Sequence, residues 1–206
     1  IASTHVVTGY QSQCIEALGL PTIHNPRWQQ TNMIGSLACA FQSLPPPFVV
    51  SYSDIVYEAD VVRQLCAAEG DFVIAYDTAW LDQWRLRFED PLSDAETFRI
   101  NSNGQVTQIG GRSADIAEIQ GQFMGLYRLS AAAVKWIADL AGTETGLLDR
   151  LDTTSMIAQL IASGKAIHGI PTAGRWFEVD TERDLQIASR LVAKGLLLRQ
   201  RGIAGW

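Results

Sequence analysis

The chain has 206 residues, of which 47% are hydrophobic and 18% charged, and its formal net charge at pH 7 is -6. This length is enough for one domain with a buried core. The acidic balance argues against a nucleic-acid surface, because phosphate backbones need clustered Lys and Arg. Three widely spaced cysteines suggest neither a disulfide framework nor a zinc site, and no apolar run approaches the roughly 20 residues that cross a bilayer. We therefore expect a cytoplasmic protein without a membrane partner.

Over the first part of the chain, strand-like apolar runs alternate with segments whose apolar residues recur at helical spacing. Such alternation predicts an α/β fold, with a mainly parallel sheet covered by helices on both faces. The expected strands are 5–9, 21–25, 48–54 and 71–76, and the expected helices are 10–18, 31–41 with Thr31 as its cap, and 59–68.

The pattern changes after Asp77. The turn Asn101-Ser-Asn-Gly104 separates two strand-like runs, 97–100 and 105–109, and Asn-Gly favours a hairpin because it tolerates positive φ. Gly110 and Gly111 lack the other residues of a phosphate-binding loop and are expected only to turn the chain. The remaining expected elements are strands 122–128 and 176–179 and helices 131–140, begun by Ser130, 153–162, capped by Asp152 or Thr153, and 181–194.

Two aspartates, Asp54 and Asp180, each end a strand-like run. Carboxylates at the carboxyl ends of buried strands can hold Mg²⁺ against nucleotide phosphates, provided that the fold brings them together. An Asp at such a position is also a common turn former or helix cap. Spacing alone leaves both interpretations open.

Residues 25–37 join a strand to a helix whose first turn can receive a base edge or an anion. Asn25 and Thr31 are equally suited to a turn and a cap, and we favour that structural role. The three histidines, among them His168 in a loop-like segment, have no Ser or Cys partner motif and are expected to be structural or solvated.

The segment 77–87 is rich in groups that could recognise a cationic, phosphate-bearing molecule. Trp80 and Trp84 lie one helical turn apart, and indole faces attract quaternary ammonium groups. Arg85 and Arg87 could pair with phosphate oxygens. The alternative is a surface helix that is anchored by two packed Trp side chains.

The chain contains, in this order, the strings His5-Val-Val-Thr-Gly-Tyr, Asn25-Pro followed by Thr31-Asn-Met-Ile-Gly-Ser-Leu, Val50-Ser-Tyr-Ser-Asp-Ile-Val, Gly121-Gln-Phe-Met-Gly-Leu and Arg175-Trp-Phe-Glu-Val-Asp-Thr-Glu-Arg-Asp-Leu. Together these strings resemble the small bacterial nucleotidyltransferases, with the CTP:phosphocholine and CTP:2-aminoethylphosphonate cytidylyltransferases as the most similar branch. The resemblance covers nearly the whole chain and implies a three-layer, Rossmann-like fold with a mixed, mainly parallel central sheet and a small hairpin insertion.

The resemblance implies transfer of a cytidylyl group (CMP) from CTP to a phosphate or phosphonate oxygen, with release of pyrophosphate. It assigns Asp54 and Asp180 as Mg²⁺ ligands, which suits a reaction between two anions. The nucleotide partners that it implies are Asn32, Gly35, Ser36, Tyr52 and Ser53.

For the acceptor, the resemblance implies a binding lid within residues 78–120. The alkylammonium end of a phosphocholine-like or 2-aminoethylphosphonate-like acceptor is expected against aromatic faces, with carboxylates as countercharge and an arginine at the phosphate. The residues concerned are Trp80, Trp84 and Phe123, then Asp77 and Glu96, then Arg87.

One part of the family pattern is absent from these 206 residues: the first β-α unit with its glycine-rich, basic triphosphate loop. Residues 1–206 are therefore expected to form a single nucleotidyltransferase domain lacking that unit, with an exposed sheet edge and weak or no catalysis if the protein truly lacks it. Two other functions stay open, a sugar-1-phosphate nucleotidyltransferase and a non-catalytic nucleotide-binding module, as does a homodimer.

Overall fold

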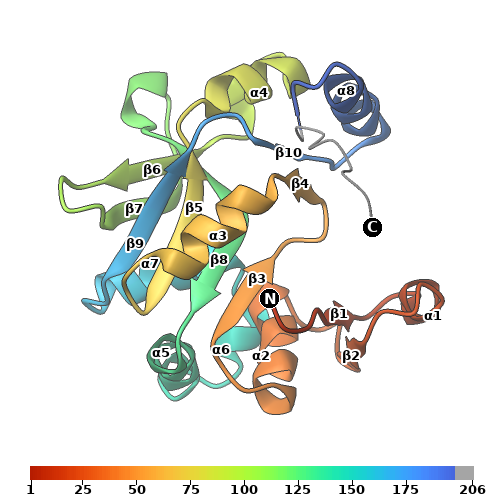
Figure 1. Ribbon diagram of the computed structural model, residues 1–206. Coiled ribbons are helices and arrows are strands. Elements are labelled where there is room, and N and C mark those ends of the chain that lie inside the picture. Colours follow the sequence, from red (N-terminus) through yellow and green to blue (C-terminus); the bar gives the residue numbers. More distant parts are fainter. Residues whose placement is uncertain (198–206) are drawn as a thin grey trace.

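The computed structural model describes residues 1–197, and residues 198–206 of the expected domain lie outside the described part of the chain. A four-stranded sheet occupies the middle of the molecule, in the order β3 (Phe48–Ser51), β8 (Gln122–Leu129), β5 (Phe72–Asp77) and β9 (Ile167–Thr172) (Figure 1). Strand β8 is antiparallel to β3 and to β5, whereas β5 and β9 are parallel. Three strands therefore run one way and β8 runs against them, which confirms a mixed, mainly parallel sheet.

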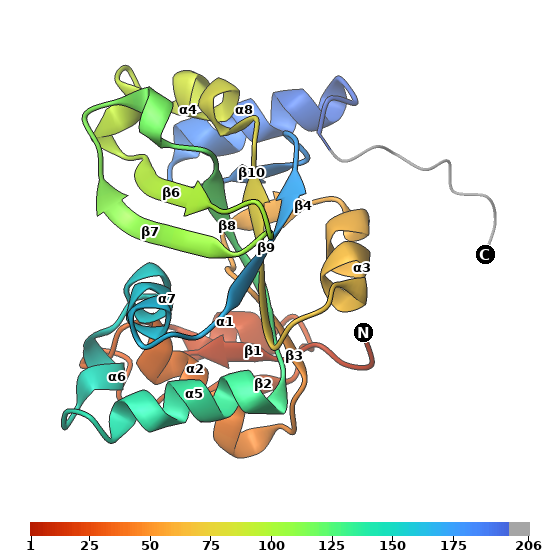
Figure 2. The ribbon, with the colours of Figure 1, turned by 90° about the vertical axis from the view of Figure 1, so that its left-hand side faces the viewer.

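The two faces of this sheet carry separate hydrophobic clusters, because successive side chains of a strand point to opposite sides. Phe72 and Ile74 face helices α2 (Met33–Ser43), α5 (Ala131–Ala141) and α7 (Thr153–Ala162). Val73 and Ala75 face α3 (Ala59–Ala67) and α4 (Trp80–Arg87). Figure 2 shows the sheet between α3 on one side and α5 and α7 on the other, which gives the expected three layers.

The expected hairpin forms from β6 (Glu96–Ile100) and β7 (Val106–Arg112) and packs over the same face as α7 (Figure 2). Asn101 accepts the N–H of Gly104, and Gly104 has φ +73°, as the turn sequence predicts. The prediction for Gly110 and Gly111 is wrong: both lie within β7, where Gly110 has φ +85°. The pair therefore belongs to an irregular strand and does not turn the chain.

Two smaller strand pairs flank the central sheet. Strands β1 (Val6–Thr8) and β2 (Thr22–His24) are parallel and carry the short helix α1 (Ser12–Glu16) between them. Strands β4 (Ile55–Tyr57) and β10 (Trp176–Glu178) are antiparallel. Within residues 1–197, the edge of β3 that faces away from β8 pairs with no strand.

Local signals located most helix starts. Ser130 accepts two N–H groups at the start of α5, and Asp152, one of the two expected caps, begins α7. Asn32, and not Thr31 as expected, caps α2. The remaining helices are α6 (Leu147–Arg150), two short 3-10 turns (Pro91–Ser93 and Ile116–Glu118) and α8 (Glu182–Ala193).

Two strands were not expected. β4 follows Asp54 directly, and His168 lies in β9 at the edge of the central sheet, not in a loop. Among the described residues, no helix combines the length and apolar character that crossing a membrane requires.

Candidate functional site

The backbone segments that carry Asp54 and Asp180 lie side by side at one end of the β4–β10 strand pair. Glu178 pairs with Ile55 across this ladder, and the Val179 N–H then donates to the Asp54 carbonyl at 2.8 Å. Asp54 thus immediately precedes β4, while Asp180 lies just beyond β10 at the same end. Both aspartates are exposed. The condition set by the sequence, that the fold bring the two aspartate segments together, is met at the level of the backbone.

Arg87, at the end of α4, lies beneath Asp180. Its side chain is only 1% exposed, and its fork donates to Glu178 at 2.6 Å, to Asp180, and to Asp184 at 3.4 Å. The expectation that Arg87 binds the acceptor phosphate is therefore corrected: the guanidinium is buried and its donors point to carboxylates of the protein itself.

The Glu178 carboxyl interacts electrostatically with Arg87 and with both aspartates. Burial raises the pKa of Glu178 and its hydrogen bond to Arg87 opposes that shift, while the nearby carboxylates of Asp180 and Asp54 raise the pKa further. The Glu178 carboxyl thus lies close enough to both aspartates to be repelled by their charge. A cation bound between Asp54 and Asp180 would relieve this repulsion.

The donor set suits a hard divalent cation that also binds a nucleotide. No group of three His, Cys, Asp or Glu side chains within residues 1–197 could hold a metal ion by itself. Mg²⁺ does not need such a group, because it commonly binds one or two carboxylates and takes its other ligands from phosphates and water. Asp54 and Asp180 supply hard oxygens of this kind, so the residues present fit Mg²⁺.

The start of α2 is a tightly ordered loop. Asn25 is 2% exposed, and its amide donates to the hydroxyls of Thr31 at 2.8 Å and Ser36 at 3.0 Å. The Arg27 N–H donates to the Asn25 side chain, and the Arg27 guanidinium makes two hydrogen bonds to Asp149. The structural role favoured for Asn25 is confirmed, while Thr31 receives a hydrogen bond instead of capping the helix.

Two expected nucleotide partners, Asn32 and Gly35, line the same loop. Asn32 is exposed and its side chain accepts the Met33 N–H. A Cβ at Gly35 would lie 2.6 Å from the Thr31 side chain, so the loop has no space for a larger residue there. Both positions thus shape the backbone at the helix start.

A second group of candidates gathers around Tyr52. Its ring meets that of Phe123 edge-on at 6.0 Å between centroids, and burial raises the pKa of its hydroxyl. Thr153 and the carboxylate of Glu96 lie close enough to influence the pKa of Tyr52. The Thr153 hydroxyl donates to the Met33 sulfur at 3.7 Å, which links this group to the start of α2. Ser53 is exposed in the bend that leads to Asp54.

The two tryptophans expected to bind an ammonium group are core residues. Trp80 and Trp84 are each 3% exposed, and their rings meet edge-on at 5.8 Å. Trp84 also packs against Trp176 and donates its indole N–H to Asp94 at 3.1 Å. The expected cage is therefore not formed by these residues; they anchor α4, as in the alternative interpretation.

Asp77 likewise has a structural role. It is fully buried, and its carboxylate accepts the N–H groups of Ala79 and Gly174 at 2.9 Å and the Trp176 indole N–H at 3.0 Å. The expectation that it provides countercharge for an ammonium group is corrected, because its oxygens are already satisfied inside the protein.

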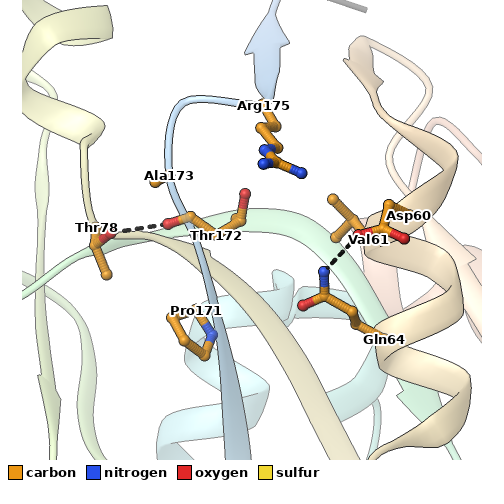
Figure 3. Close-up of a pocket in the computed structure, with 8 residues that line it drawn as sticks. All are labelled: Asp60, Val61, Gln64, Thr78, Pro171, Thr172, Ala173 and Arg175. Carbon is orange, nitrogen blue, oxygen red and sulfur yellow. Dashed lines mark hydrogen bonds between the residues drawn. The ribbon is translucent and has the colours of Figure 1, made fainter. Parts of the chain in front are cut away.

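A separate pocket of about 290 Å³ lies between α3 and the end of β9, near the segment that precedes β10 (Figure 3). Its lining includes Arg175, Gln64, which donates to Asp60, and Thr78, which donates to the Thr172 carbonyl. None of the candidate site residues from the sequence lines it.

Sequence reasoning missed several residues that order the site. Glu178 stands inside a matching string, and Asp184 follows Thr181 at capping-box spacing, so both carried a local signal. Asp149 and Thr153 act on residues more than a hundred positions away, and no local pattern announces such contacts.

Comparisons with known proteins bear on this arrangement. No family model matches the chain. Over 176 residues it is 28% identical to the CTP:phosphoglutamine cytidylyltransferase of Campylobacter jejuni, covering 79% of this chain and 69% of that protein. Over 194 residues it is 30% identical to the bifunctional IPC transferase and DIPP synthase of Rubrobacter xylanophilus, covering 91% of this chain but only 41% of that protein.

Solved structures agree on the fold. The inositol-1-phosphate CTP transferase from T. maritima superposes with a TM-score of 0.68 at 14% identity, covering 97% of this chain and 77% of that one. The resemblance read from the sequence is thereby confirmed: the chain has the nucleotidyltransferase fold and is similar in sequence to a cytidylyltransferase.

Proposed function

We propose that this chain carries the catalytic site of a Mg²⁺-dependent cytidylyltransferase, which transfers CMP from CTP to a small phosphate- or phosphonate-bearing acceptor. The observation that carries the proposal is the β4–β10 ladder, which sets the backbones of Asp54 and Asp180 side by side. The C. jejuni relative, named as a CTP-dependent enzyme, supports CTP as the nucleotide.

The reaction joins two anions. An acceptor oxygen attacks the α-phosphorus of CTP, the bond from that phosphorus to the bridging oxygen breaks, and pyrophosphate leaves with the electron pair. Mg²⁺ held by Asp54 and Asp180 would neutralise phosphate charge and hold the triphosphate in line. The acceptor oxygen is already anionic, so the site needs no general base.

The base and ribose of CTP are assigned to the start of α2. Asn32, Gly35 and Ser36 stand there, and the buried amide of Asn25 fixes the loop through Thr31 and Ser36. Tyr52 and Ser53 lie on the segment between this loop and Asp54, consistent with a nucleotide that spans from α2 to the aspartates.

The acceptor is assigned to the aromatic and acidic group around Tyr52. Phe123, which meets the Tyr52 ring edge-on, supplies a ring surface for the acceptor, and Glu96 supplies negative charge. Such a combination favours an acceptor with an amine or alkylammonium end, such as phosphocholine or 2-aminoethylphosphonate. The relatives add other phosphorylated acceptors to the test, because one of them is named for phosphoglutamine.

The test is pyrophosphate release with each of CTP, ATP, GTP and UTP against a panel of acceptors: phosphocholine, 2-aminoethylphosphonate, phosphoglutamine, inositol-1-phosphate and glucose-1-phosphate. It should use the natural full-length protein. Release with CTP and one of the first three acceptors is expected. Release with glucose-1-phosphate alone would point to a sugar nucleotidyltransferase. No pyrophosphate release with any pair of nucleotide and acceptor would point to a binding module.

The aspartates provide the residue-level test of the same proposal. Asp54→Asn and Asp180→Asn keep the side-chain shape but remove the charge, so each should lower turnover by about 100-fold or more. Arg63→Met, which breaks only the exposed Arg63–Asp60 pair on α3, is the matched control and should leave turnover unchanged. Undiminished turnover in either Asn variant would refute the metal assignment.

A further inference from the structure

Arg87 connects the candidate metal site to the protein interior. Its guanidinium is almost completely buried, whereas the Asp180 carboxylate that it holds is 49% exposed. Only one Asp180 oxygen, Oδ2, takes part in this contact. The Asp180 carboxylate is therefore hydrogen-bonded to Arg87 through one oxygen, while about half of its side chain remains exposed.

The same guanidinium also orders the backbone next to Asp180. Its Nε donates to one oxygen of Asp184, and the other oxygen of Asp184 accepts the N–H and hydroxyl of Thr181 in a capping box. Thr181 directly follows Asp180. Arg87 thus fixes Asp180 twice, through its carboxylate and through the turn that carries it.

Helix α4 provides a rigid base for these contacts. Gln83, one turn before Arg87, accepts the Glu178 N–H at 2.9 Å. The guanidinium lies 5.5 Å from the Trp84 ring centroid and 5.0 Å from that of Phe88. Only a planar fork can serve three carboxylates while stacking on aromatic rings, so Lys could not replace Arg fully.

We propose that Arg87 is a positioning residue, which orients the Asp180 carboxylate so that its other oxygen is presented to Mg²⁺. This inference rests on the proposed function, because it takes Asp180 as a metal ligand. The competing explanation is that Arg87 only neutralises the partly buried carboxylate of Glu178 and the buried carboxylate of Asp184.

The experiment must separate positioning from neutralisation. Arg87→Met alone would leave buried carboxylates unpaired and could unfold the protein. The informative comparison is therefore between Glu178→Gln/Asp184→Asn, which keeps Arg87, and the same pair combined with Arg87→Met. Both variants lack the two carboxylates that would otherwise need a partner, and thermal unfolding should show that both fold.

The readout is binding of Mn²⁺ and CTP to the full-length protein, followed by the relaxation rate of water protons around Mn²⁺. If Arg87 positions Asp180, adding Arg87→Met should weaken Mn²⁺ binding by about tenfold or more relative to the double variant, as losing a partner of a metal ligand commonly does. Replacing Arg87 by Lys instead of Met in the double-variant background (Arg87→Lys) should restore part of the lost Mn²⁺ binding. Arg63→Met serves as the control that removes a distant guanidinium.

Equal Mn²⁺ binding in the double and triple variants would overturn the inference, as would a wild-type protein that binds no Mn²⁺ in the presence of CTP. Failure of the proposed function looks different. A wild-type protein that binds Mn²⁺ through Arg87-supported Asp180 but releases no pyrophosphate contradicts the cytidylyltransferase proposal and leaves the positioning role standing.

Discussion

The Glu96 carboxyl shows how one residue's surroundings create a pH dependence. Burial at the base of the hairpin raises the pKa of Glu96, and the neighbouring Asp152 carboxylate raises it further. The Thr154 hydroxyl, 3.4 Å from Glu96, and Arg112 act in the opposite direction. The ionised form is thus less favourable in the folded protein than in the unfolded chain.

The sign of the resulting stability change follows from proton linkage. Because the pKa of Glu96 is higher in the folded state, the folded protein holds this proton more tightly, and the contribution to stability falls as pH rises from the ordinary Glu range through the raised pKa. The Glu96→Gln variant cannot ionise at this position, so it does not lose this stability as pH rises. Urea unfolding should show the variant more stable than wild type at pH 7, with the gap closing at acid pH; a gap independent of pH would contradict the assignment.

Residue roles depend on burial, which a short stretch of sequence does not reveal. The segment containing Trp80, Trp84 and Arg87 is expected from its composition to bind the acceptor, but all three side chains are buried, and burial decides whether an indole is a binding surface or a core residue. That burial depends on Trp176, which packs on Trp84 from a strand some ninety positions away. For Asp54 and Asp180, local patterns reveal only that both stand at ends of apolar runs, and their proximity follows from the pairing of β4 with β10. Their role as metal ligands stays a prediction.

At the scale of elements, prediction succeeded where the signal is local. The hairpin turn at Asn101–Gly104 and the caps of α5 and α7 depend on neighbours within a few residues. Strand β4 has three residues and exists because it pairs with β10, and β9 contains Gly169 and Pro171, which are poor strand formers. Non-local pairing of this kind cannot be read from a short window.

Gly125 in β8 gives a prediction at this scale. It has φ +70°, sits where the β5–β8 register shifts, and a Cβ there would lie 2.5 Å from the Tyr52 ring. Gly125→Ala combines backbone strain with a clash, so it should cost about 3 kcal/mol in unfolding free energy. It should also displace Tyr52, which is readable as a change in tyrosine absorbance.

Gly104→Ala is the matched control for this prediction. Gly104 has φ +73°, yet no atom lies within 4 Å of a Cβ placed there. Its cost should be about 1 kcal/mol, from backbone strain alone. Urea denaturation of the two variants checks the difference, and equal losses would mean that Tyr52 does not press on Gly125.

At the scale of the whole molecule, the candidate site draws its residues from two parts of the structure. The central sheet with its two clusters forms the core, and the β4–β10 pair with α8 builds on one end of it a third, smaller cluster around Phe177 and Ala188 (Figure 1). The aspartates belong to the smaller part, while the start of α2 belongs to the larger. A nucleotide bound to both would therefore be expected to tie the two parts together.

The pair β1–β2 should be the least stable sheet in the described chain. Of its two strands only Thr8 is buried, its hydroxyl has no partner, and α1 between them contains no buried residue. Every residue of β5 is buried. Two-stranded sheets are marginal by themselves, and this pair is held mainly through α2.

Hydrogen exchange measures this difference directly. The Val6 and Asn25 amides, which bond to the Pro21 and Thr8 carbonyls, should exchange on the order of 100-fold faster than the amides of β5, because local opening of the pair exposes little apolar surface. Saturating CTP and Mg²⁺ should slow exchange at Asn25, since its side chain orders the loop assigned to the nucleotide, and leave β5 unchanged. Exchange at Val6 as slow as in β5 would show that the pair opens only when the whole protein unfolds.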